Sequence, residues 1–240
     1  MFKTIKMKIK LIIYSLLIFS LIIKTSIAQN HENVNTWANF EQFKSANDKL
    51  SQLKNGEERI VFLGNSITIG WEETHPEFFE NTIYVNRGIS GQTTPQMLVR
   101  FYADVIDIGA TTVVILAGTN DIAGNTGPMS IDMILNNLKS MTGIALANNV
   151  KVILCSVLPA YDYPWSPNKN PNIKIPKLNS KIKKYAKKSG VHYLDYFKAL
   201  DNGNNGIDKE FSYDGVHLTL EGYKVLEPMV EDALKKVKNK

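Results

Sequence analysis

Ser66 is the first residue whose position in the sequence suggests chemistry. It follows the apolar run 60–63 through Gly64 and Asn65. A hydroxyl at the end of a buried strand can cap a helix, bind a phosphate group or act as a nucleophile. As a nucleophile, a serine hydroxyl needs a neighbouring base that removes its proton. The role of Ser66 therefore depends on whether the chain supplies such a base.

His217 is the best candidate base among the four histidines of the chain. The others lie near the N-terminus (His31), in a polar loop (His75) and inside a strand pattern (His192). Asp214 precedes His217 by three residues, and a carboxylate at this spacing can turn back to accept a hydrogen bond from the imidazole. On its own, a D-x-x-H pair also arises where an aspartate caps a helix near an unrelated histidine.

Acyl transfer by a serine also requires hydrogen-bond donors that stabilise the oxyanion of the transition state. The backbone N–H groups of Ser66 and Gly88 and the side-chain amide of Asn120 are candidates. Gly88 has no Cβ, so its backbone can approach a ligand closely. Asn120 lies between Gly118 and Asp121, so the formation of a turn is its alternative role.

Short apolar segments alternate with longer amphipathic segments after residue 58. Strands are predicted over residues 59–63, 82–86, 112–116, 150–157 and 191–194, and helices over about 93–107, 130–148, 172–189 and 219–238. This alternation is typical of an α/β protein whose parallel sheet is covered by helices on both faces. Because the carboxyl ends of parallel strands share one edge, we expect Ser66, Gly88 and Asn120 to meet there.

Four short motifs, taken in this order, resemble the SGNH/GDSL hydrolase superfamily over residues 59–230. They are Gly-Asn-Ser ending at Ser66, the segment with Gly88, Gly-Thr-Asn-Asp with Asn120, and Asp-Gly-Val-His from Asp214 to His217. The resemblance implies a flavodoxin-like three-layer α/β/α sandwich with a five-stranded parallel sheet, no metal and no cofactor. It implies that Ser66 is the nucleophile, His217 the base and Asp214 the acid that orients the base. Gly88 and Asn120 become oxyanion donors together with the N–H of Ser66.

Asn65 departs from the pattern of the superfamily, which usually has aspartate at this position. An asparagine can keep the hydrogen bonds of a turn but not the charge. The chain also differs from the ordinary α/β-hydrolases, whose nucleophile elbow needs a glycine two residues after the serine. Thr68 occupies that position here.

The N-terminal residues 1–28 are predicted to be a secretory signal peptide. Four lysines precede the uncharged apolar run 11–23, and Ser26-Ile27-Ala28 forms a small-residue cleavage site. The run is shorter than the 18 or more residues expected of a membrane span, and an uncleaved anchor is the alternative. We expect cleavage after Ala28, export to the periplasm or the extracellular space, and no stable membrane insertion afterwards. Residues 29–58 are predicted to form a helical extension packed on a hydrolase domain over 59–240.

The charge of the chain is unevenly distributed. Five of its 28 basic residues and none of its 23 acidic residues lie in residues 1–28, so the remainder carries 23 of each. A formally neutral domain has no electrostatic footprint for nucleic acid, and we expect no such partner. The only cysteine, Cys155, lies in an apolar strand pattern and is predicted to be buried and inert. The sequence does not predict the oligomeric state.

Two loops have a composition that could indicate a binding site. Residues 158–176 hold five of the nine prolines together with Tyr161, Tyr163 and Trp165, which are predicted to bind substrate. The alternative is a surface crossover whose aromatic rings pack on the domain. Residues 201–210 superficially resemble a calcium loop, but Gly203 stands at the position of the second oxygen ligand and Ser212 replaces the bidentate glutamate. A solvated turn is the better interpretation.

The expected function is that of a secreted serine esterase that works through an acyl-enzyme. The aromatic loop favours a carbohydrate O-acetyl esterase acting on a small ester or an acylated glycan. Lysophospholipase, thioesterase and arylesterase activities of the same superfamily are the alternatives. A non-catalytic module that binds a flavin or another ligand is an alternative of a different class, and a degenerate hydrolase without turnover is a third.

Overall fold

The computed structural model describes residues 33–239 except 51, 55 and 81–82. The chain forms two compact units, residues 1–37 and 38–240. Of the first unit only residues 33–37 are described, most of them in helix α2 (Val34–Ala38). The predicted signal peptide and the start of the predicted 29–58 extension lie outside the described residues. In the part of the chain that is described, no helix has the length and apolar character needed to cross a membrane.

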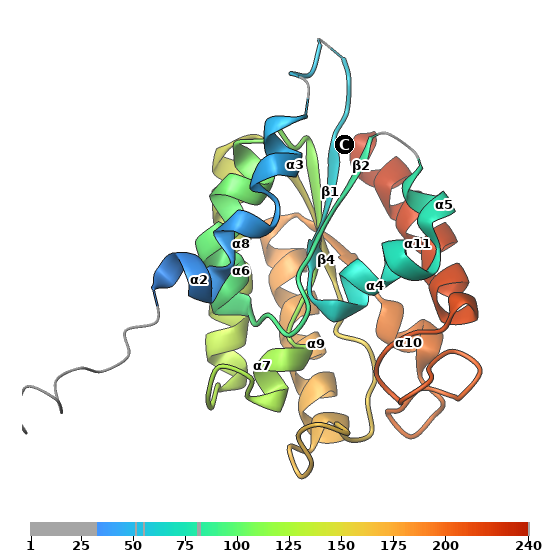
Figure 1. Cartoon of the computed structure of the whole chain (residues 1–240). Coiled ribbons are helices and arrows are strands. Elements are labelled where there is room, and N and C mark those ends of the chain that lie inside the picture. The colour runs from blue at the N-terminus through green and yellow to red at the C-terminus, as the bar shows by residue number, and fades with distance from the viewer. Residues whose placement is uncertain (1–32, 51, 55, 81–82, 240) are drawn as a thin grey trace, which may run out of the picture. The chain divides into compact units, whose positions relative to one another are not determined.

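The second unit is built on a five-stranded parallel sheet (Figure 1). Its strands are β1 (Ile60–Gly64), β2 (Tyr84–Gly88), β3 (Thr112–Leu116), β4 (Lys151–Cys155) and β5 (His192–Leu194). They lie in the order β2-β1-β3-β4-β5, which is the flavodoxin-like order. β1 and β3 are buried along their whole length, as expected of strands covered on both faces. The predicted fold class is confirmed.

Helices cover both faces of the sheet. Figure 1 shows α6 and α8 on one side of the sheet and α4, α5 and α11 on the other. The longer helices follow the predicted ranges and are α6 (Thr94–Phe101, continued by a π-helical turn over Tyr102–Ile106), α8 (Ile131–Ala147), α9 (Pro171–Ser189) and α11 (Leu220–Lys238). Four short helices were not predicted, namely α4 (Ser66–Thr74), α5 (Pro76–Phe79), α7 (Thr119–Ala123) and α10 (Tyr196–Leu200).

The segment before β1 forms short pieces of helix. After α2 come a 3₁₀ turn (Phe40–Gln42) and α3 (Lys44–Asp48), and the positive φ of 55° at Asn39 separates α2 from the turn. Within the second unit, Phe43 is buried beneath the Arg87 guanidinium, whose carbon lies 4.7 Å from the ring centroid. Asn47 Oδ1 accepts hydrogen bonds from the same guanidinium. Residues 38–58 therefore belong to the same compact unit as the sheet.

Arg100 of α6 holds the carboxyl ends of β1 and β2 together. Its guanidinium is fully buried and donates to the carbonyl oxygens of Gly64 (3.2 Å) and Arg87 (2.9 Å). It also donates to Gln92 Oε1 at 2.6 Å and forms an ion pair with Asp104 at 2.8 Å. These bonds satisfy backbone groups at the point where the strands end, so they fix the edge of the sheet from which Ser66 projects.

Cys155 lies at the end of β4 and is buried, as predicted. Burial raises the pKa of its thiol, against a smaller opposing effect of a hydrogen bond with Tyr196. A buried thiol that stays protonated is a poor nucleophile. Cys155 therefore takes no part in the chemistry considered below.

Candidate active site

Ser66 lies at the first residue of α4, directly after the turn that ends β1. Asn65 caps this helix, because its buried side-chain oxygen accepts a hydrogen bond from the N–H of Ile67 at 3.2 Å. The turn is tight at Gly64, where a Cβ would collide with the Thr68 side chain and lie 2.8 Å from the carbonyl oxygen of Leu116. Asparagine thus supplies the cap that the usual aspartate would supply, without its charge.

Ser66, His217 and Asp214 form a continuous chain of hydrogen bonds. Ser66 Oγ lies 2.9 Å from His217 Nε2, and His217 Nδ1 lies 2.6 Å from Asp214 Oδ2. An ionised carboxylate can only accept, so His217 Nδ1 is the donor in that pair. The other ring nitrogen, Nε2, is then free to accept the proton of the Ser66 hydroxyl. This is the arrangement in which an imidazole can act as a general base for a serine.

The second oxygen of Asp214 fixes the loop that carries His217. Asp214 Oδ1 accepts from the backbone N–H groups of Val216 (2.9 Å) and His217 (2.7 Å). Partial burial acts to raise the pKa of Asp214, but the hydrogen bonds from His217 and Val216 outweigh it and lower the pKa below its ordinary value. The carboxylate therefore stays ionised well below neutral pH. Ser212 Oγ donates to the carbonyl oxygen of His217 at 2.7 Å and closes the same loop.

Asn120 lies at the start of α7, just past the carboxyl end of β3, which pairs with β1. Its side chain is buried, and Nδ2 donates to the carbonyl oxygen of Gln92 at 3.0 Å. An amide nitrogen carries two protons, so the second remains for a ligand. The bond to Gln92 fixes the orientation of the amide in advance, which is what an oxyanion donor requires.

Gly88 does not have the geometry predicted for it. Its N–H donates to Asn86 Oδ1 at 2.8 Å, so this donor is already used. A Cβ at Gly88 would collide with the backbone nitrogen of Ile69 and lie 2.9 Å from the carbonyl oxygen of Asn65. Glycine is needed here because β2 packs directly against the start of α4. The prediction that Gly88 is an oxyanion donor is therefore wrong.

Gly91 is a candidate backbone donor that the sequence analysis did not consider. It is exposed and has a φ of 77°, a region that favours glycine. Its carbonyl oxygen accepts from Asn125 Nδ2 at 3.0 Å, and the next residue, Gln92, is the partner of Asn120. Gly91 is thus held beside Asn120, in the loop that follows Gly88. The second glycine of the sequence Gly-Ile-Ser-Gly was the available signal.

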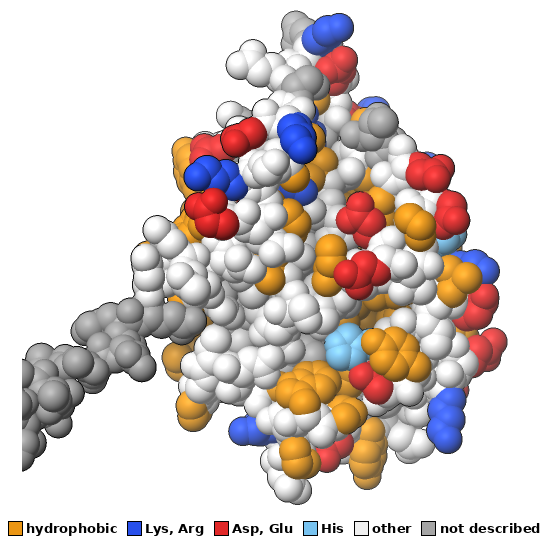
Figure 2. Space-filling view, in the orientation of Figure 1, with side chains coloured by type: hydrophobic (Ala, Val, Ile, Leu, Met, Phe, Trp, Pro, Cys, Tyr) orange, Lys and Arg blue, Asp and Glu red, His pale blue; other side chains and the backbone are white. Residues whose placement is uncertain are grey.

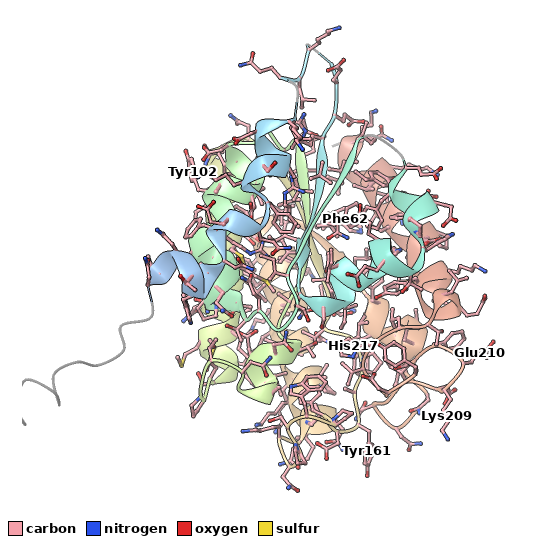
Figure 3. All side chains as sticks on the ribbon, in the orientation of Figure 1. Phe62, Tyr102, Tyr161, Lys209, Glu210 and His217 are labelled. Atoms are coloured by element: carbon pink, nitrogen blue, oxygen red, sulfur yellow. The ribbon has the colours of Figure 1, made fainter. Side chains whose placement is uncertain are left out.

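Aromatic side chains border His217 on two sides. The rings of Trp165 and Tyr213 each lie 5.9 Å from the imidazole, and Tyr213 is stacked on it at 13°. Trp165 is 42% exposed and Tyr213 is 72% exposed, so both rings offer surface to a ligand. In Figures 2 and 3, which share one orientation, His217 lies among hydrophobic side chains on the visible face. Tyr213 was not predicted, although it directly precedes Asp214.

The three predicted aromatic contacts of the 158–176 loop differ in exposure. Tyr161 is 66% exposed, whereas Tyr163 is only 1% exposed. Tyr163 is stacked under Trp165 with 5.1 Å between the ring centroids. Its ring therefore supports Trp165 and has no free face for a substrate, which corrects its predicted role. Trp165 Nε1 donates to Asn125 Oδ1 at 3.2 Å, so Asn125 links this loop to Gly91.

The family model of GDSL-like lipases and acylhydrolases matches residues 62–225, a range that contains the whole hydrogen-bonded chain from Ser66 to His217. The chain belongs to the GDSL-like lipase/acylhydrolase family. It is accordingly a hydrolase of ester bonds, and the resemblance found in the sequence is confirmed. A search of curated proteins found no match.

Solved structures of proteins described as acylhydrolases or lipases are similar to this acylhydrolase. A Bacteroides fragilis protein described as an acylhydrolase is 43% identical, with 83% of this chain and 97% of that chain covered and a TM-score of 0.81. A GDSL-like lipase from Bacteroides thetaiotaomicron is also 43% identical, over 83% and 98% of the two chains, with a TM-score of 0.80. A Streptococcus pneumoniae protein described as a platelet activating factor is 25% identical over 89% and 99%, with a TM-score of 0.68.

Asp121, next to Asn120 in the acylhydrolase, is a buried carboxylate with a structural role. It accepts from the backbone N–H of Thr94 (3.0 Å) and from Thr94 Oγ1 (2.5 Å) and so holds the start of α6 against α7. Burial raises the pKa of Asp121 to about 6, although the hydrogen bonds from Thr94 oppose the change. In the described ranges, no group of three or more His, Cys, Asp or Glu residues is placed to hold a metal ion.

Asp121→Asn should remove a pH-dependent part of the stability. The folded state binds a proton at Asp121 up to about pH 6, whereas the unfolded chain loses it near 3.8. The free energy of unfolding of the wild type should therefore fall as pH rises between these values, by on the order of 3 kcal/mol from this residue. An asparagine does not titrate, and its Oδ1 can still accept from the N–H and Oγ1 of Thr94, although the second contact of that N–H, with Oδ2, is lost. Urea unfolding of both proteins from pH 4 to pH 7 measures the difference, and identical pH profiles would contradict the assignment.

Proposed function

We propose that this acylhydrolase works through an acyl-enzyme on Ser66. Ser66 Oγ attacks the carbonyl carbon of the ester while His217 Nε2 takes the hydroxyl proton. The tetrahedral intermediate collapses by breaking the bond to the alcohol oxygen, and His217 returns the proton to the leaving alcohol. A water molecule then attacks the acyl group by the same route, which releases the carboxylic acid and restores Ser66. The strongest support is the pair of hydrogen bonds that joins Ser66 Oγ to His217 Nε2 (2.9 Å) and His217 Nδ1 to Asp214 Oδ2 (2.6 Å).

The oxyanion of both intermediates is proposed to be stabilised by the N–H groups of Ser66 and Gly91 and by the Asn120 amide. The Ser66 N–H lies at the N-terminus of α4, where the first backbone N–H groups of a helix have no partner within it. Gly91 replaces Gly88 because the Gly88 N–H is bonded to Asn86. A structure of the enzyme inhibited by a phosphonate would test this, since the phosphonyl oxygen should lie about 3 Å from the nitrogen of Gly91 and farther from that of Gly88.

Asn120→Ala should lower kcat by about 10²–10³-fold, because a preorganised donor to the oxyanion is lost. Hydrolysis of p-nitrophenyl acetate measures the effect, with the melting temperature as a check of folding. The matched control is Asn136→Ala, which removes an exposed amide from the surface of α8. Losses of the same size in the two variants would show that Asn120 is not a donor.

The proposed substrate is an O-acetyl ester of a carbohydrate. The exposed rings of Trp165 and Tyr213 beside His217 support this proposal, because sugar rings pack their apolar faces on aromatic side chains. The test is hydrolysis of p-nitrophenyl esters from acetyl to dodecanoyl, together with acetate release from acetylated saccharides. Turnover confined to short acyl groups and saccharide acetates supports the proposal. A maximum at long chains would move the assignment to a lysophospholipase or a lipid thioesterase.

We also propose that the enzyme is exported after cleavage behind Ala28. The lysines, the apolar run and the small residues of the leader support this proposal. N-terminal sequencing of the protein from a cell fraction would test it, with Gln29 expected as the first residue. The alternative of a non-catalytic flavin module has no support in the family match, which is to hydrolases.

A further inference from the structure

A cavity of about 710 Å³ lies beside the loop that carries His217. Three segments line it: the aromatic loop from Tyr161 to Pro167, the loop from Asn202 to Ile207, and the residues Asp214 and Gly215. Its volume is in the range of small-molecule sites. The 202–207 segment is the asparagine-rich stretch that resembled a calcium loop in the sequence, and the catalytic arrangement described above gives it no role.

The position of the cavity assigns it to the alcohol part of the ester. His217 must give its proton to the leaving oxygen, so the alcohol lies on the histidine side of the scissile bond. The oxyanion donors belong to Ser66, Gly91 and Asn120, and none of these residues lines the cavity. Asp214 and Gly215, which line the cavity, lie three and two residues before His217 in the chain. His217 and Trp165 do not line the cavity themselves, but Trp165, whose ring borders the imidazole, lies between the lining residues Pro164 and Pro167.

The 202–207 loop is held rigid by its own hydrogen bonds. Asp201 Oδ1 accepts from the N–H groups of Gly203 (3.1 Å) and Asn205 (2.8 Å). Asn202 Oδ1 accepts from the N–H of Asn204 at 3.0 Å. Among the described residues, the exposed side-chain amide of Asn204 has no hydrogen-bond partner. The free side-chain amide on this fixed backbone is suited to binding hydroxyl groups of a substrate, since an amide both donates and accepts hydrogen bonds.

The charge of the cavity wall disfavours one class of leaving group. Asp162 and Asp214 both border the cavity, and none of the described residues that line it is a lysine or an arginine. Two carboxylates with no lysine or arginine beside them in the lining disfavour a phosphate group, which lysophospholipids and coenzyme A thioesters both carry in their leaving group. The hydroxyl groups of a neutral sugar can instead donate hydrogen bonds to Asp162 and bond to Asn204, and the exposed ring of Tyr161 provides a stacking surface.

We propose that this cavity is the alcohol subsite of the enzyme and that it selects neutral, polyhydroxylated leaving groups over phosphate-bearing ones. The proposal rests on the ester hydrolysis proposed above. Tyr161, Asp162 and Asn204 are the residues that determine this specificity. Asp162 Oδ1 also accepts from the N–H of Tyr163 at 2.9 Å, so Asp162→Asn can remove the charge and keep the turn.

Three acetates with different alcohols test the proposal: an O-acetylated neutral disaccharide, p-nitrophenyl acetate and 1-acetylglycerol 3-phosphate. Relative to p-nitrophenyl acetate, kcat/KM for the disaccharide should fall about three- to tenfold in Tyr161→Ala and in Asn204→Ala. In Asp162→Asn, kcat/KM for the phosphate-bearing acetate should rise severalfold relative to kcat/KM for p-nitrophenyl acetate. Tyr102→Ala is the control, because Tyr102 is an exposed tyrosine that Figure 3 places at the opposite end of the molecule from Tyr161.

The outcomes separate this inference from the proposed function. Suppose that the wild type hydrolyses p-nitrophenyl acetate, but the cavity variants keep the same kcat/KM values relative to that ester as Tyr102→Ala. The proposed subsite is then wrong, whereas the proposed esterase function is unaffected. A wild-type preference for the phosphate-bearing acetate over the disaccharide would also overturn the subsite. If no Ser66-dependent turnover of p-nitrophenyl acetate is found, the proposed function fails, and the inference fails with it.

Discussion

Ser66→Ala should lower kcat for ester hydrolysis by at least about 10⁴-fold and leave the fold intact. The variant removes the oxygen that forms the acyl-enzyme, so neither His217 nor the oxyanion donors can replace its function. The Ser66 hydroxyl makes its hydrogen bond to His217, whereas the helix cap is supplied by Asn65. Alanine at the first position of a helix is well tolerated, so the melting temperature should change little.

Steady-state hydrolysis of p-nitrophenyl acetate measures this loss. The matched control is Ser140→Ala, which removes an exposed serine hydroxyl from α8 that donates to the carbonyl oxygen of Asn136. The control should retain turnover within about twofold, as expected of a surface change. Removing a nucleophilic serine leaves some catalysis by the oxyanion donors and by binding, so a small residual rate is expected. Turnover by Ser66→Ala close to that of the wild type would show that the nucleophile lies elsewhere.

Asp214→Asn should lower kcat by about 10⁴-fold with little change in structure. The asparagine oxygen can still accept from the N–H groups of Val216 and His217, so the loop keeps its shape. The asparagine nitrogen, however, donates to His217 Nδ1, which moves the imidazole proton to Nε2. That nitrogen then cannot accept the proton of Ser66, because the imidazole is in the wrong tautomer.

The rate of p-nitrophenyl acetate hydrolysis tests this prediction, with Asp132→Asn as the control. Asp132 is an exposed carboxylate paired with Lys181 at the surface, so its neutralisation changes charge without reaching the site. A loss of less than about tenfold in Asp214→Asn would mean that Asp214 does not set the tautomer of His217.

The sheet and its active edge were predictable because they follow from local pattern. Buried parallel strands are short continuous apolar runs, and each observed strand overlaps a predicted one. The carboxyl ends of parallel strands coincide by topology, so Ser66 and Asn120 had to lie near each other. The ends of β2 and β4 differ from the prediction by two residues, since a periodic pattern does not mark where pairing stops.

The short helices around the site were not predictable in the same way. α4 begins at Ser66 and α7 begins at Thr119, within the Gly-Asn-Ser and Gly-Thr-Asn-Asp motifs. The glycine and asparagine residues of these motifs are typical of turns, so the sequence pattern does not predict that a helix follows. α4 becomes a helix because Asn65 caps it and because Trp71 packs against Phe62 of β1, with 5.7 Å between the ring centroids. Such contacts depend on tertiary structure and leave no period in the sequence.

Gly88 and Tyr163 show where reasoning from residue type fails. Gly88 was expected to approach a ligand closely, but it approaches the backbone of α4 instead. Tyr163 was grouped with Tyr161 and Trp165 because all three share a loop, yet the fold buries it beneath Trp165. A glycine or an aromatic residue in a sequence does not reveal which neighbour it meets, and three-dimensional contact decides that.

Covalent labelling with a fluorophosphonate tests the central claim most directly. The reagent should inactivate the wild type with one equivalent bound, and peptide mass spectrometry should place the label on Ser66. Ser66→Ala should remain unlabelled, and Asp214→Asn should react more slowly because the base is misaligned. A label on another residue, or continued ester hydrolysis by protein that is unlabelled after full exposure to the reagent, would contradict the acyl-enzyme mechanism.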